Sequence, residues 1–173
     1  IIMTGSEKNV CSIIIGDDVE IENITKGLNV DFQIHNDHIQ GKINISESSE
    51  KYLINLSNTR EKKFILDLEV IISENSFLEL RDESDYEYGS DIIISSIMNK
   101  DSIFEFFRLN NFKDNTKNTF NHNIELALNC EFRDFNFSNG SNEMDNSTTV
   151  SLNEENASYI GSGVMISNST NSN

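Results

Sequence analysis

Residues 70–80, VIISENSFLEL, place an apolar run, a short polar break and a second alternating apolar run in direct succession. The same order of residue types recurs at residues 13–21, 97–106 and 150–160, with weaker copies near residues 47–49 and near Asn129. The polar breaks fall roughly 27 residues apart along most of the chain, a period typical of solenoid proteins. The repeat therefore predicts stacked β rungs.

Alternating apolar residues predict strands over most of the chain. A period of two residues is the mark of a strand with one buried face, and no stretch keeps the spacing of an amphipathic helix. Polar segments at 110–123 and 138–147 are predicted to be loops, and 167–173, SNSTNSN, a polar tail. The alternating residues are Val30, Phe32 and Ile34; Ile43 and Ile45; Ile124, Leu126 and Leu128; and Phe135 and Phe137.

Together these patterns predict that residues 1–173 form one all-β unit, a right-handed parallel β-helix that is possibly incomplete. In such a stack, the inward side chains of each rung lie on those of the next and bury a continuous core. Asn, Asp and Gly suit the tight turns between strands. Both ends of the stack are expected to expose unpaired strand edges, which need a cap or a partner.

Charge and cysteine content narrow the function classes. The chain has 29 acidic and 13 Lys or Arg residues, and its net charge of −16 would repel a phosphate backbone, so nucleic-acid binding is not expected. No apolar run is long enough to span a membrane, and the first residues lack the features of a signal peptide. Cys11 and Cys130 suggest no disulfide framework, which favours the cytoplasm, and Cys130 fits a small buried thiol.

Candidate site residues are few. His35 and His38, with Asp37 between them, could converge on a metal only in a turn, and His122 is far away in sequence. Acidic groups at Asp17-Asp18, Asp82-Glu83-Asp85 and Glu154-Glu155 could suggest a glycoside hydrolase, although turns of a β-helix also favour acids. No phosphate loop, nucleophile elbow or zinc-helix motif occurs. We expect no catalytic residue and no metal ligand, and the cofactor-binding residues are unknown.

The C-terminal half resembles a known family. The stretches MNKDSIFEFFRLNN (98–111), HNIELALNCEFRDF (122–135) and TVSLNEENASYIGSGVMIS (149–167) are similar, in order and spacing, to the β-helix core of the SufB/SufD family of iron–sulfur cluster assembly scaffolds. A family phrase maps onto Leu152, Glu154 or Glu155, Ala157 and Gly161. DLEVIISENSFLEL (67–80) is similar to another, so the resemblance covers roughly residues 65–167, with SufD as the closer likeness.

This resemblance implies a non-catalytic scaffold subunit. Proteins of this kind pair through β-helix edges with a SufB-like paralogue and act with a SufC-like ABC-type ATPase. An iron–sulfur cluster would be assembled on the complex, with no cofactor bound by this chain alone. The ATPase-docking region has no counterpart up to Asn173, and no functional residue of the family can be carried over. The alternative from another class is a surface or secreted β-helix that binds or cleaves carbohydrate.

Overall fold

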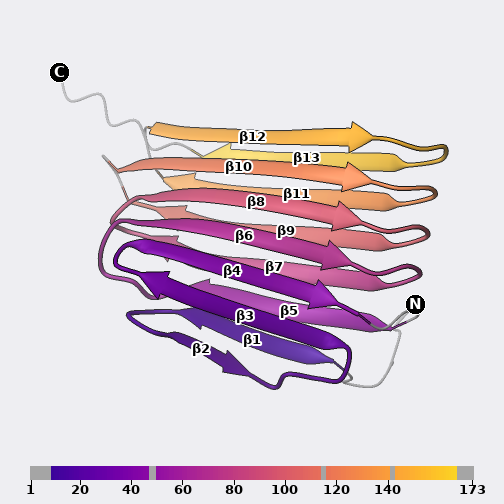
Figure 1. The fold of residues 1–173 in the computed structure, drawn as a ribbon. Coiled ribbons are helices and arrows are strands. Elements are labelled where there is room, and N and C mark those ends of the chain that lie inside the picture. The colour runs from indigo at the N-terminus through magenta and orange to yellow at the C-terminus, as the bar shows by residue number, and fades with distance from the viewer. Residues whose placement is uncertain (1–8, 47–49, 114–115, 141–142, 167–173) are drawn as a thin grey trace, which may run out of the picture.

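The computed structural model describes residues 9–46, 50–113, 116–140 and 143–166, and in that part of the chain every regular element is a strand (Figure 1). No helix in these residues is long and apolar enough to cross a membrane. The strands are β1 (Val10–Ile15), β2 (Val19–Glu22), β3 (Leu28–His35), β4 (His38–Ile45), β5 (Lys51–Asn58), β6 (Phe64–Ile72), β7 (Phe77–Tyr86), β8 (Ser90–Met98), β9 (Ile103–Phe112), β10 (Lys117–Leu126), β11 (Glu131–Gly140), β12 (Glu143–Leu152) and β13 (Ser158–Ile166).

From β4 onward the chain alternates between two stacked parallel sheets and forms a right-handed β-solenoid of about four turns. One sheet has the order β13-β11-β9-β7-β5-β1-β2, and the other has the order β12-β10-β8-β6-β4-β3. Figure 1 shows the two layers running in opposite directions, with β12 and β13 at one end of the stack. The predicted parallel β-helix is therefore confirmed.

Equivalent corners repeat in successive rungs with the same left-handed backbone conformation. Asn75, Asp101, Asn129 and Asn156 have φ values of 56°, 58°, 56° and 57°. Asn and Asp tolerate this conformation better than most residues because their short side chains form local hydrogen bonds. Nδ2 of Asn129 donates to Oδ1 of Asp101 at 2.7 Å, 28 residues earlier. Nδ2 of Asn156 donates to Oδ1 of Asn129 at 3.1 Å, 27 residues earlier, so the predicted repeat of corners is confirmed.

The core lies between the two sheets and is built from alternate residues of each strand. Phe64, Leu66, Leu68, Val70 and Ile72 of β6 all point inward and are buried. Because the parallel strands pair without a shift in register, similar residues of successive rungs stack on one another. In the facing sheet, the ring of Phe132 lies 5.3 Å from that of Phe104 and 5.4 Å from that of Tyr159.

The N-terminal end of the solenoid departs from the predicted parallel stack. Residues 13–21, which resemble the repeat, form an antiparallel hairpin in which Ile15 lies opposite Val19. The amide of Gly16 donates to the carbonyl of Asp18 at 2.9 Å, which closes a turn too short to cross to the other sheet. β3 and β4 form a second antiparallel hairpin. The weak copy of the repeat near residues 47–49 lies outside the described residues, as does the predicted tail at 167–173.

The predicted loops at 110–123 and 138–147 are wrong for most of their length. β9 extends to Phe112, β10 begins at Lys117, β11 extends to Gly140 and β12 begins at Glu143. Some polar residues of these segments point into the solenoid and bond to polar residues of neighbouring rungs. Asn118, for example, is buried and accepts a hydrogen bond from Ser90 of the neighbouring rung at 3.1 Å.

Candidate functional site

The two ends of the solenoid differ. Within the described residues, each sheet has a strand paired on one side only at both of its ends, and at the C-terminal end these strands are β12 in one sheet and β13 in the other. We call this pair of free edges the open end. Large apolar side chains are exposed on its two strands: Leu152, Ile160, Val164 and Ile166. At the opposite end, the outermost strands β2 and β3 belong to the antiparallel hairpins.

A buried ion pair lies directly beneath the open end. Nη2 of Arg108 in β9 donates to both carboxylate oxygens of Asp134 in β11, at 2.9 and 2.7 Å. Nη1 of Arg108 donates to Oδ1 of Asn146 at 3.3 Å, and the guanidinium carbon lies 3.9 Å from the centre of the Phe120 ring. Thr148 Oγ1 donates to Asp134 at 3.4 Å. The pair therefore joins strands of both sheets.

Between β12 and β13, above this ion pair, is a polar cavity of about 370 Å³. We call it the end cavity. It exists because two inward positions of β13 are glycines: Gly161 lies opposite Asp134, and Gly163 lies opposite Asn136. The cavity is lined by Arg108, Asp134, Asn136, Asn146, Thr148, Tyr159, Gly161, Ser162 and Gly163.

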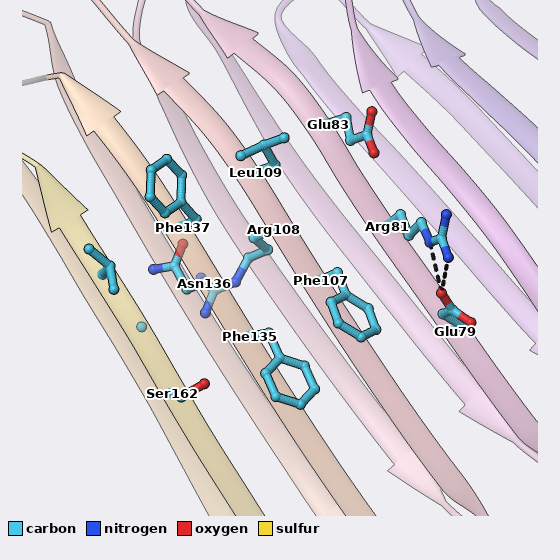
Figure 2. Close-up of a pocket in the computed structure, with 12 residues that line it drawn as sticks. Glu79, Arg81, Glu83, Phe107, Arg108, Leu109, Phe135, Asn136, Phe137 and Ser162 are labelled. Carbon is cyan, nitrogen blue, oxygen red and sulfur yellow. Dashed lines mark hydrogen bonds and ion pairs between the residues drawn. The ribbon is translucent and has the colours of Figure 1, made fainter. Parts of the chain in front are cut away.

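A second hollow lies on the outer face of the sheet that contains β7, β9, β11 and β13. This outer groove, of about 490 Å³, has a floor of Phe107, Leu109, Phe135, Phe137 and Val164. The rings of Phe107 and Phe135 stack with centroids 4.8 Å apart. Figure 2 shows Arg81 and Glu79 at one side of the groove, where Nε of Arg81 donates to Glu79 at 2.7 Å. An apolar floor with a few polar groups is typical of a ligand site.

Of the three candidate histidines, the structure places two opposite each other. His35 and His38 lie opposite each other across the β3–β4 turn, while His122 is in the core. The ring nitrogen Nε2 of His122 lies 2.8 Å from Oγ of Ser96, and burial, together with the charge of Arg108, lowers the pKa of His122 to about 3. Among the residues that the structure describes, no group of three or more His, Cys, Asp or Glu side chains could hold a metal ion.

The three candidate acidic groups also lie in different parts of the structure. Asp17 and Asp18 lie in the β1–β2 turn, and Glu154 and Glu155 lie in the corner before β13. Glu154 accepts a hydrogen bond from the Leu128 amide of the previous rung at 3.1 Å, which is a structural role.

In the third acidic group, Asp82 points inward, while Glu83 and Asp85 are exposed. Asp82 accepts hydrogen bonds from Ser84, from the Tyr86 hydroxyl at 3.0 Å and from Asn110 at 3.2 Å. Burial raises the pKa of Asp82 above its ordinary value. Within the described residues, therefore, none of the three groups presents two carboxylates to a shared open site.

Both cysteines are buried and unpaired. The thiol of Cys130 donates to the carbonyl of Asn99 at 3.0 Å, and burial raises the pKa of the Cys11 thiol. A buried thiol with a raised pKa is a poor nucleophile and a poor metal ligand. The prediction of a buried thiol at Cys130 is confirmed.

The alternation of apolar residues in the sequence predicted neither the end cavity nor the outer groove. Phe135 and Phe137 were predicted on a strand with one buried face, but they point outward, and Phe132 and Asp134 point inward. One signal was present in the sequence: β13 carries two glycines at alternate positions, which removes two side chains from one face of a strand.

In comparisons with known proteins, no family model, no curated protein and no solved structure matches this chain.

Proposed function

We propose that this chain is a non-catalytic scaffold subunit that pairs through its open end with a second β-solenoid protein. The observation that carries the proposal is the difference between the two ends. Within the described residues, the N-terminal edge strands β2 and β3 belong to antiparallel hairpins and β2 has only 4 residues, whereas the C-terminal edge strands β12 and β13 continue the parallel stack over 10 and 9 residues. Free strand edges are ready templates for pairing with another chain.

The side chains at the open end support pairing. Outward-facing Ile160 and Val164 of β13 are exposed, at 50% and 56%, and Val164 belongs to the apolar floor of the outer groove. A strand that paired with β13 would bury part of this surface, and each square ångström of apolar surface removed from water contributes roughly 25 cal/mol. The net charge of −16 disfavours self-pairing and favours a less acidic partner.

The specific form of the proposal is a SufD-like subunit of a cytoplasmic iron–sulfur cluster assembly complex, with a SufB-like paralogue as partner and a SufC-like ATPase in the same complex. Its support is the order and spacing of the motifs at 98–111, 122–135 and 149–167. Cluster assembly needs accessible thiolates, and Cys11 and Cys130 are buried. Cluster ligands would therefore come from the partner.

The test is binding of the purified SufB-like paralogue from the same genome, measured by titration calorimetry. The chain should bind it, and the double variant I160K/V164K should lose at least tenfold in affinity, because each lysine places a charge in the pairing surface. The matched control is I24K, since Ile24 is equally exposed, at 55%, but lies outside the open end. Absence of binding by the unaltered chain would contradict the iron–sulfur proposal.

The outer groove supports a second candidate function, binding of carbohydrate on the outer sheet. Aromatic rings offer apolar faces to sugars, and the groove combines Phe107 and Phe135 with the charged groups of Arg81 and Glu83. Retention on a polysaccharide column that is lost in Phe135→Ala would favour this function. Retention unchanged in that variant would exclude the groove as the cause.

A further inference from the structure

We propose that the end cavity is a socket for an uncharged amide side chain, Asn or Gln, carried by the partner strand that pairs with β13. This inference rests on the proposed pairing at the open end, and it adds what the partner must present there. The partner strand is predicted to place this residue at the inward position opposite Gly163.

The register of the sheet determines where that side chain would lie. Within the stack, inward residues of neighbouring strands are directly opposite each other: Asp82, Arg108 and Asn136 follow one another in β7, β9 and β11. The next member of this column is Gly163. A strand added outside β13 continues the column, and its inward side chain meets no side chain at Gly163 and can reach down into the cavity.

The cavity has room for this side chain. Its volume of about 370 Å³ is on the order of ten times the space that one water molecule takes in the liquid, roughly 30 Å³. Every other member of the column within β7, β9 and β11 has a side chain that fills the interior. At Gly163 the column has no side chain, and a residue of a strand outside β13 can supply one.

The polar groups that line the end cavity favour an amide over a charged side chain. Arg108 and Asp134 are nearly buried and already neutralise each other, so a charged side chain in contact with them would add a charge without a counter-charge beside a buried pair, which is costly. Asn136 and Asn146 line the cavity, and their amide groups can donate to a new acceptor. Asp134 and Asn136 supply oxygen acceptors nearby. An amide offers both an acceptor and a donor.

The experiment fills the cavity from within the chain. Gly163→Gln places the amide in the cavity itself, and its Cβ would lie 3.3 Å from the Asn136 carbonyl oxygen and 3.5 Å from Asn136 Cβ, a tight approach that a shift of a few tenths of an ångström relieves. The matched control is Ser158→Gln, which adds the same side chain at an outward-facing position of β13 that lines neither the end cavity nor the outer groove. Circular dichroism and a melting curve first establish that both variants fold like the unaltered chain.

Calorimetric titration with the SufB-like paralogue then separates the outcomes. We expect Gly163→Gln to weaken binding at least tenfold and Ser158→Gln to weaken it less than twofold. If Gly163→Gln binds normally while I160K/V164K does not, the socket is overturned and the proposed pairing stands. If the unaltered chain does not bind the paralogue, both fall.

A second readout addresses a small-molecule site. Melting curves are recorded with a panel of neutral monosaccharides at 10 mM, on the order of the concentrations at which weak sugar sites respond. No shift is expected in any variant. Stabilisation of the unaltered chain by a sugar, lost in Gly163→Gln, would show that the end cavity binds a free ligand and would overturn the socket.

Discussion

Arg108 and Asp134 lie 26 residues apart in sequence, yet Nη2 of Arg108 contacts both carboxylate oxygens of Asp134 at 2.9 and 2.7 Å inside the solenoid. Their side chains are almost fully buried, at 2% and 6% exposure. One rung of the stack separates the two residues, so the solenoid period itself brings them together. The pair forms the floor of the end cavity and links the open end to the core.

Removing one partner of this pair should cost more than removing both. Arg108→Met leaves Asp134 buried without its counter-charge, and about 3–5 kcal/mol of unfolding free energy should be lost. The double variant Arg108→Met/Asp134→Leu should recover a large part of that loss, because no buried charge remains. Urea unfolding of Arg108→Met, of Asp134→Leu and of the double variant measures these changes in unfolding free energy. Equal losses in the single Arg108 variant and the double variant would contradict the prediction.

His122 should make stability depend on pH. Its pKa is about 3 in the folded chain and 6.5 in the unfolded chain, so below about pH 6.5 only the unfolded state takes up the proton. The stability contribution of neutral His122 is present above pH 6.5 and is lost at about 1.4 kcal/mol per pH unit as the pH falls toward 3.

His122→Gln provides the comparison, because Gln can keep a hydrogen bond to Ser96 and does not titrate. The difference in unfolding free energy between the unaltered chain and this variant should shift in favour of the variant by about 2 kcal/mol between pH 6.5 and pH 5. The carboxylates titrate in both proteins and cancel in the difference. A constant difference over this range would rule out a neutral, buried His122.

The free energy of unfolding should depend on the side chain at Asn129, which lies in the row of hydrogen-bonded corner residues Asp101, Asn129 and Asn156. Asn129→Ala keeps a Cβ at a φ of 56° but removes the side-chain hydrogen bonds to Asp101 and Asn156, so it should cost about 1–2 kcal/mol. Asn129→Gly should cost less, because glycine adopts this conformation freely. Asn153→Ala, an exposed residue of the corner before β13, is the control. If Ala and Gly at 129 were equal in cost, backbone strain would not contribute.

The two thiols should be protected in the folded chain. A disulfide-exchange reagent at pH 8 should react with neither Cys11 nor Cys130 before unfolding, because both are buried, and with both in 6 M urea. Rapid modification of either residue under native conditions would contradict the burial and would reopen a ligand role for that thiol.

When the charge repulsion between copies of the chain is lost, the open end should promote self-association. The chain's isoelectric point is about 4.4, and near this pH the repulsion that keeps copies apart at neutral pH is largely gone. Light scattering should therefore show association between pH 4 and 5, and association at constant pH should be weaker in V164K than in I24K. Equal association of the two variants would locate the contact elsewhere.

The repeat and most of the strands could be predicted from the sequence because both depend on neighbouring residues. The corners at Asn75, Asp101 and Asn156 follow from a local preference for left-handed backbone, and the buried face of β6 follows from its alternation. Loops were predicted wrongly at 110–123 because Asn118 and His122 are polar. Their hydrogen-bond partners, Ser90 and Ser96, lie a full rung earlier, where a local pattern cannot find them.

The sequence by itself determined a solenoid with a rung of roughly 27 residues, because period-two alternation and corner residues act over a few positions. Only the tertiary structure decided which residues meet. In β9 and β11 apolar residues occupy both faces, as with Phe106 and Phe107, so alternation alone cannot orient Phe135. Pairing across rungs settled that orientation, joined Arg108 to Asp134, and left β12 and β13 with free edges, because register depends on the neighbouring rung.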